Sequence, residues 1–187
     1  MKIYFRKTFE YDPQINGLSK YESYDRVVRQ TYSPEIVTPQ SHENFDLPTL
    51  CSNLKRCIQT AEIISSGRIT ILNELREIKF SMHGLLSEKE YEEFGSNMVR
   101  ERFIQAFIND SLLEKRIEIQ KRMKRVIKLI TKGSNDKLVV SHSFAMKIFE
   151  AFFLHKKDIF TNSSLISEFI FPQTKTYGFG EGFEVII

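Results

Sequence analysis

Five ionisable side chains follow short apolar runs at well-separated points of the chain: Arg6, Lys7, Arg56, Glu77 and His142. A phosphate ester presents several anionic oxygens, so a site that binds it needs cations and N–H donors aimed at one place. Hydrolysis also needs a proton donor for the leaving oxygen, and a carboxyl group can serve. Once gathered by a fold, the four basic residues would bind phosphate and Glu77 would act as acid and base.

The hydrophobic pattern indicates the elements that must gather these residues. Strands alternate with helices, so we predict an α/β protein, a three-layer α/β/α sandwich around a mostly parallel sheet. Residues 8–45 are polar and rich in turn signals, with a short helix expected inside 20–31. Strands are expected at 2–6, 47–51, 69–72, 138–140 and within 163–187, and helices at 53–66, 87–109, 112–132 and 143–155.

Parallel strands end at a common edge of their sheet, and ligands bind beyond that edge. The candidate residues lie at such strand ends, together with Thr8, Ser52 and Ser143, which we also expect in the pocket. His83 is a further pocket candidate, although a lone histidine in a surface loop more often has no such role. Ser52 or Asn53 is expected to cap the helix that follows.

Three segments of the sequence resemble motifs of the histidine phosphatase superfamily, in its phosphoglycerate-mutase-like branch. Residues 52–62 resemble S-x-L-x-R-x-x-Q-T-A-E, residues 75–80 resemble L-R-E-I-x-F, and residues 138–142 resemble V-V-S-H. The resemblance implies a phosphoglycerate-mutase-like domain over 1–187, with 85–112 as a helical cap or insertion. It also implies phosphatase or phosphomutase chemistry without a metal or cofactor, with phosphate on Arg6, Arg56 and His142 and with Glu77 as acid and base.

The sequence departs from the family pattern at the nucleophile. In the family the first strand ends in R-H-G, and that histidine becomes phosphorylated; here Lys7 takes its place and Thr8 replaces the glycine. Ser143 and Ser81 likewise stand where the family has glycine. A lysine ammonium must lose a proton before it can attack, and its reference pKa is about 10.4. With a phosphate dianion bound, Lys7 should be charged and should bind phosphate rather than attack it.

Three functions remain open at this stage. The first is a phosphoester-binding protein that is impaired or inactive as a phosphohistidine-dependent phosphatase. The second is an active phosphomonoesterase on a small phosphorylated metabolite, with water activated by Glu77, the Lys7 amine or Thr8 as nucleophile. The third is a nucleic-acid-binding module that uses the basic helix at 114–132, which carries eight Lys or Arg and two Glu. A solvated outer helix face explains that charge more simply, so a nucleic-acid partner is disfavoured.

Composition sets outer limits on these readings. The chain has 187 residues, a formal net charge of +3 and two cysteines, which excludes a disulfide framework and favours a reducing compartment. The opening residues lack a signal-peptide apolar run and no segment has membrane-spanning length, so a cytoplasmic protein without a membrane partner is expected. The expected partner is a phosphorylated small molecule or a phosphate or sulfate ion, and a homodimer is left open.

Overall fold

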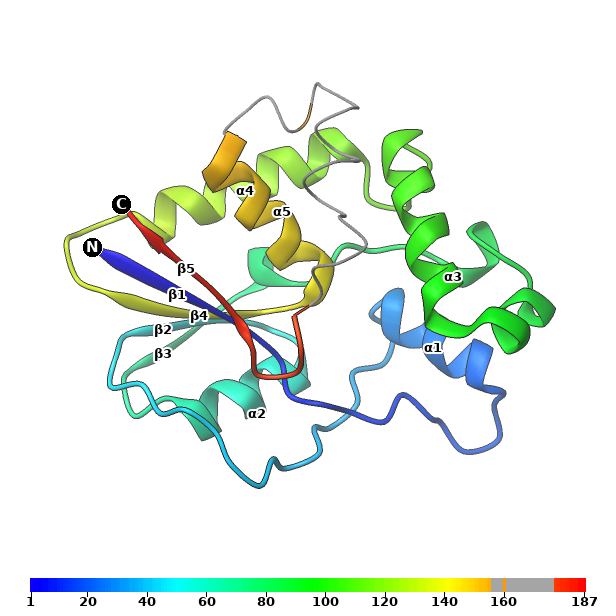
Figure 1. The fold of residues 1–187 in the computed structure, drawn as a ribbon, viewed down its shortest axis with the longest axis horizontal. Coiled ribbons are helices and arrows are strands. Elements are labelled where there is room, and N and C mark those ends of the chain that lie inside the picture. Colours follow the sequence, from blue (N-terminus) through cyan, green and yellow to red (C-terminus); the bar gives the residue numbers. More distant parts are fainter. Residues whose placement is uncertain (156–159, 161–176) are drawn as a thin grey trace.

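The computed structural model describes residues 1–155, 160 and 177–187, and it has a central five-stranded sheet (Figure 1). The strand order is β3-β2-β4-β1-β5, and only β5 runs antiparallel to its neighbour. In chain order the elements are β1 (Lys2–Lys7), α1 (Lys20–Val28), β2 (Thr49–Ser52), α2 (Lys55–Ile64), β3 (Ile69–Leu72), α3 (Glu88–Ile108), α4 (Arg116–Ile130), β4 (Lys137–Ser141), α5 (Ser143–His155) and β5 (Gly182–Ile186).

Two apolar cores lie on opposite faces of this sheet. Alternate residues of a strand point to opposite faces, so Val139 packs with α4 and α5, whereas Leu138 and Val140 pack with α2. Figure 1 shows α2 on one side of the strands and α4 with α5 on the other. The predicted α/β sandwich with a mostly parallel sheet is confirmed.

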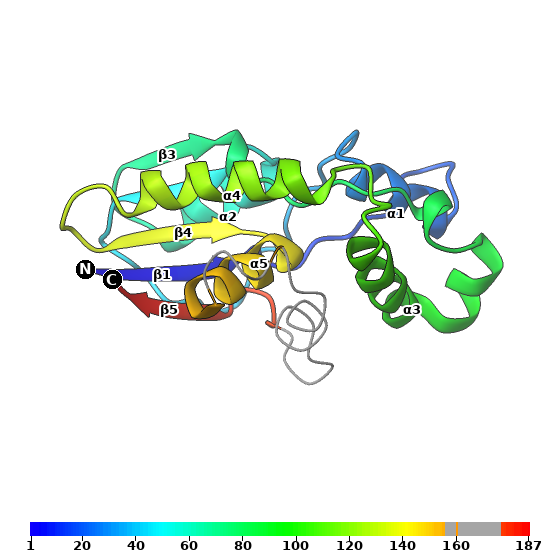
Figure 2. The same ribbon diagram turned by 90° about the horizontal axis from the view of Figure 1, so that it is seen from above.

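Helices α1 and α3 lie beyond the carboxyl ends of the parallel strands in both views (Figures 1 and 2). Ser87 and Glu90 form a capping box at the start of α3, which holds that end of the helix. The helix kinks at Gly95, whose φ is 64°. Residues that carry a Cβ rarely adopt this backbone conformation. The helical character predicted for 87–109 is confirmed, and the role of 85–112 as a cap stays a prediction.

The start of α2 differs from the sequence prediction. The N-cap residue is Leu54, which makes no side-chain capping bond, so the prediction of a cap by Ser52 or Asn53 is wrong. Ser52 Oγ instead accepts a hydrogen bond from the Leu54 N–H at 3.2 Å and faces His142. Because β2 extends through Ser52, that side chain belongs to the strand and is unavailable to the helix.

The C-terminal edge strand was predicted within 163–187, and β5 confirms it for 182–186. Residues 161–176, which include the first part of that prediction, lie outside the described residues. Gly182 pairs with Arg6, and a Cβ at this glycine would lie 1.7 Å from the Phe5 carbonyl oxygen. Only glycine therefore permits the close approach of β5 to β1. Within the described residues, no helix has the length and apolar character needed to cross a membrane.

Candidate functional site

A cavity of about 330 Å³ lies at the carboxyl ends of the parallel strands. Strands β1 and β4 pair in a register that places Lys7 opposite Ser141, so Lys7 and His142 leave the sheet at the same edge. The cavity is lined by Lys7, Thr8, Tyr11, Pro13, Tyr24, Val27, Val28, Arg56, Glu77, Phe80, Ser96, His142, Ser143, Phe144 and Phe179. The fold thus brings together six of the predicted site residues: Lys7, Thr8, Arg56, Glu77, His142 and Ser143.

Arg56 comes from the first turn of α2 and is 3% exposed. Its guanidinium carbon lies 5.0 Å from the centre of the Tyr11 ring. Among the described residues, its Nε and Nη1 atoms are buried and have no hydrogen-bond partner. A buried cation with unused N–H donors is costly unless an anion or another acceptor satisfies it.

Glu77 is held by the N-terminal turn of α5. Its Oε1 accepts hydrogen bonds from the N–H groups of Ile78 and Ala145, both at 2.9 Å, and its Oε2 accepts one from Phe144 at 3.1 Å. These bonds and the helix dipole favour the carboxylate, but burial is the larger effect and raises the pKa of Glu77 above its ordinary value. A carboxyl group with a raised pKa is suited to donate a proton.

His142 is neutral in this environment. Burial, followed by the charges of Arg56 and Arg122, lowers its pKa well below the ordinary value of 6.5. Its Nε2 lies 3.0 Å from Ser52 Oγ and 3.3 Å from Cys57 Sγ, and these two hydrogen bonds hold the orientation of the imidazole ring. Ser52 therefore supports His142 from outside the cavity and does not line it.

Lys7 is covered by the chain segment that precedes β5. Its Nζ donates a hydrogen bond to the Tyr177 carbonyl at 3.1 Å and lies 4.2 Å from the centre of the Phe179 ring. Burial lowers its pKa, while the carboxylates of Glu77 and Glu181 act in the opposite direction. The amine at this position is thus partly desolvated and close to Glu77.

Two predicted site residues lie elsewhere. Arg6 points to the opposite face of the sheet from Lys7, because successive side chains of β1 alternate, and its Nη2 donates to Glu43 at 2.8 Å. The structure therefore does not bring Arg6 into the cavity. His83 is 62% exposed, lies 3.2 Å from the Tyr21 hydroxyl and belongs to a different surface depression.

The site residues predicted from the sequence do not include the aromatic side chains that form the walls of the cavity. Tyr24 of α1 lines the cavity together with Phe179, which lies within the glycine-rich turn before β5. Tyr11 also lines the cavity, and its ring meets the Phe179 ring edge-on, with 6.3 Å between the ring centres. Burial raises the pKa values of both Tyr11 and Tyr24, so their hydroxyls remain protonated near neutral pH. In the part of the chain that the structure describes, no cluster of His, Cys, Asp or Glu side chains is arranged to hold a metal.

Solved structures with the same fold are distant in sequence. An alpha-ribazole phosphatase from Shigella flexneri has a TM-score of 0.55 and 19% identity, over 96% of this chain and 87% of that one. The product of an open reading frame from Mycobacterium tuberculosis has a TM-score of 0.58 and 13% identity, over 98% and 88%. A mycobacterial glucosyl-3-phosphoglycerate phosphatase has a TM-score of 0.56 and 13% identity, over 96% and 86%.

The sequence comparisons identify a family but no individual relative. No curated protein matches the chain significantly. The family model of the histidine phosphatase superfamily (branch 1) matches residues 38–161, which confirms the resemblance predicted from the motifs around Arg56, Glu77 and His142. The matched stretch begins after β1, so it does not include Lys7. The chain belongs to the histidine phosphatase superfamily, branch 1.

Proposed function

We propose that the cavity binds the phosphoryl group of a phosphomonoester. The observation that carries the proposal is Arg56, which lines the cavity and has two buried N–H donor atoms without a partner among the described residues. Lys7 supplies a second cation, and the only carboxylate that lines the described part of the cavity, Glu77, is engaged by three backbone N–H groups. An anion with several oxygens would satisfy these unused donors.

The organic part of the ester would meet apolar and aromatic walls. Tyr11, Tyr24, Phe80, Phe144 and Phe179 surround the polar end of the cavity. Such walls favour a flat or apolar group, which can pack against the aromatic faces. A volume of about 330 Å³ is at the small end of ligand sites, so the substrate class is a compact phosphomonoester such as an aryl phosphate.

Lys7 makes turnover through a phosphohistidine impossible at the family's nucleophile position. Burial lowers the pKa of Lys7, but its amino group donates to the Tyr177 carbonyl and lies over the Phe179 ring, and both contacts favour the charged form. A bound phosphate would favour that form further. We therefore expect the protein to bind the phosphomonoester without transferring its phosphoryl group to the Lys7 amine.

Binding is tested by calorimetric titration with phenyl phosphate and with inorganic phosphate. We expect Arg56→Met to weaken both by roughly tenfold to a hundredfold, because a charge-assisted hydrogen bond contributes about 1.5–3 kcal/mol. Arg68→Met is the matched control, since Arg68 is exposed and does not line the cavity. Equal affinity in the wild type and Arg56→Met would contradict the proposal.

An active phosphomonoesterase is the second candidate, and the lowered pKa of Lys7 favours it. A partly desolvated amine near Glu77 has a larger neutral fraction than a free lysine, so it could attack phosphorus. The two candidates differ in an assay with an aryl phosphate. Binding without hydrolysis by the wild type supports the first, and hydrolysis that disappears in Lys7→Ala supports the second.

A further inference from the structure

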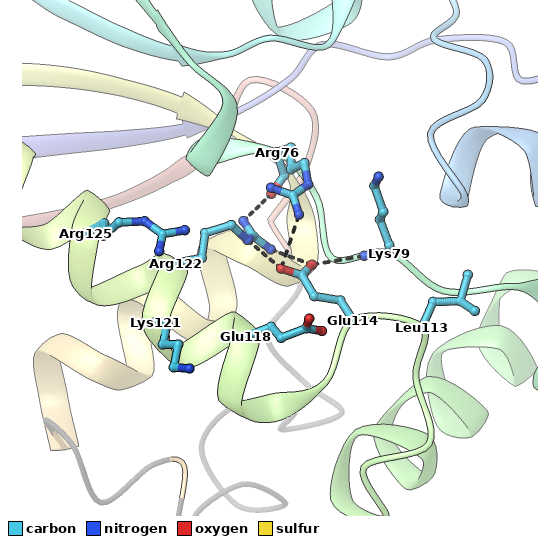
Figure 3. Close-up of a pocket in the computed structure, with 8 residues that line it drawn as sticks. All are labelled: Arg76, Lys79, Leu113, Glu114, Glu118, Lys121, Arg122 and Arg125. Atoms are coloured by element: carbon cyan, nitrogen blue, oxygen red, sulfur yellow. Dashed lines mark hydrogen bonds and ion pairs between the residues drawn. The ribbon is translucent and has the colours of Figure 1, made fainter.

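A second cavity, of about 500 Å³, lies between α4 and the chain segment that carries Glu77 (Figure 3). Neighbouring residues of this segment serve different cavities: Arg76 and Lys79 line the second, whereas Glu77 and Phe80 line the first. The second cavity is lined by Arg76, Lys79, Leu113, Glu114, Glu118, Lys121, Arg122 and Arg125. Five of these residues are cationic and two are carboxylates.

A buried ion pair forms the rigid floor of this cavity. Arg122 is 2% exposed and holds Glu114 with two hydrogen bonds, Nε to Oε1 at 2.7 Å and Nη2 to Oε2 at 2.9 Å. Its Nη1 also donates to the carbonyls of Glu74 and Arg76, at 2.7 and 2.8 Å. Glu114 is therefore already neutralised, and the floor is tied to the segment that carries Glu77.

The remaining cations have little compensation from the described residues. Arg76 Nε is buried and has no hydrogen-bond partner among them, and its Nη2 is 3.5 Å from Glu114. Lys79 and Lys121 make no ion pair within the described part of the chain, and Arg125 reaches Glu74 only at 3.9 Å. Figure 3 shows Arg76, Arg122 and Arg125 along one wall, with Lys79 and Lys121 on either side of Glu114. Burial and then the charge of Arg122 lower the pKa of Arg76, Glu114 and Glu74 act in the opposite direction, and Arg125 lowers it further.

We propose that this second cavity binds a small, multiply charged phosphate anion such as pyrophosphate. Several cations that crowd one hollow are stabilised most by a ligand with several negative oxygens, and guanidinium groups fit phosphate oxygens in pairs. The hollow is concave, which suits a compact anion better than the extended backbone of a nucleic acid, and its five cations outnumber the carboxylates of Glu114 and Glu118. In this proposal the basic residues of α4 that line the second cavity bind the anion. The proposal does not depend on the phosphomonoester proposal for the first cavity.

The test is a calorimetric titration with pyrophosphate, at low and at physiological ionic strength. The double variant Lys121→Gln/Arg125→Gln removes two exposed charges from the rim of the second cavity. Its matched control, Lys124→Gln/Lys128→Gln, removes two exposed charges from the same helix at the same spacing but outside the cavity. We expect one binding event to weaken roughly tenfold or more in the first variant and to stay unchanged in the control. Because all four residues are exposed, both variants should fold, and circular dichroism checks this.

The outcomes separate this site from the first cavity and from diffuse surface charge. Arg56→Met should leave the second event intact, so loss of that event alone in Lys121→Gln/Arg125→Gln supports the proposal whatever happens at Arg56. Equal weakening in both double variants would overturn it in favour of non-specific attraction. Tighter binding of a short oligonucleotide, equally reduced in both variants, would overturn it in favour of a nucleic-acid surface. Absence of any event sensitive to Lys121 and Arg125 would also overturn it.

Discussion

Replacement of Arg56 by methionine is expected to affect the stability of the free protein and of the phosphate-bound protein differently. In the free protein the buried guanidinium has two N–H donor atoms without a partner among the described residues. Exchange of a buried charged group for an apolar one of similar volume often stabilises a protein by about 1–4 kcal/mol. Loss of the contact with Tyr11 offsets about 1 kcal/mol of this gain. We therefore expect free Arg56→Met to be at least as stable as the free wild type, with a gain of about 0–3 kcal/mol from these two effects.

Saturating phosphate should stabilise the wild type more than the variant, by about 1–2 kcal/mol, because the variant binds phosphate roughly tenfold to a hundredfold more weakly. A ligand at a hundred times its dissociation constant stabilises the native state by about 2.7 kcal/mol, and only the wild type should receive this gain in full. For a chain of 187 residues, each kcal/mol corresponds to a shift in Tm of about 2–4 °C.

Thermal and urea denaturation, each with and without phosphate, measure both halves of this prediction. The control Arg68→Met should stay within about 0.5 kcal/mol of the wild type in both conditions, since Arg68 is exposed. A structural role for Arg56 predicts a different pattern: the variant would be less stable than the wild type by the same amount in both conditions. That pattern would refute the assignment of Arg56 to an anion.

Three further predictions address the nucleophile, the buried histidine and the sheet edge. Lys7→His should raise the rate of aryl phosphate hydrolysis about tenfold or more over the wild type, which corresponds to about 1.4 kcal/mol in the barrier, whereas Lys7→Gln should not. A steady-state assay with no gain in Lys7→His would count against Lys7 as the residue that prevents turnover. The folded-state pKa of His142 is below its ordinary value of 6.5, so its contribution to stability is full above pH 6.5 and is lost as the pH falls toward the folded-state pKa. In urea denaturation across this range, the free energy of unfolding should therefore fall less steeply with decreasing pH for His142→Gln than for the wild type. Equal steepness in the two proteins would be inconsistent with a buried neutral ring. Gly182→Ala should cost about 2 kcal/mol or more, because its Cβ would overlap the Phe5 carbonyl; an unchanged urea midpoint would show that β5 does not approach β1 so closely.

The layered fold and most of the site were predictable because they depend on local patterns. Apolar runs and helical spacing indicated the strands and helices, and the parallel strands then had to end at one edge. That rule alone placed Lys7, Arg56, Glu77 and His142 near each other. The prediction for Ser143 and Thr8 followed from the same edge, since each is adjacent in sequence to a strand-end residue.

The features that the sequence did not reveal depend on orientation and on distant contacts. Arg6 and Lys7 are neighbours in β1, and the direction of each could be known only once β1 was placed between α2 and α5. Phe179 reaches the cavity because the segment before β5 returns over Lys7, with Gly180 N–H bonded to the Lys7 carbonyl at 3.2 Å. The second cavity depends on Arg122, which is buried, whereas helical periodicity placed basic residues of this helix on an outer face.

The central claim is that Arg56 and Lys7 bind a phosphoryl group in the first cavity. A crystal structure of the protein with inorganic phosphate or phenyl phosphate tests it most directly. The predicted result is a phosphate within hydrogen-bond distance of Arg56 Nε and Nη1 and of Lys7 Nζ, with the phenyl ring against Tyr11 or Phe179. Phosphate that binds only elsewhere, while the Arg56 donors pair with protein atoms, would contradict the account.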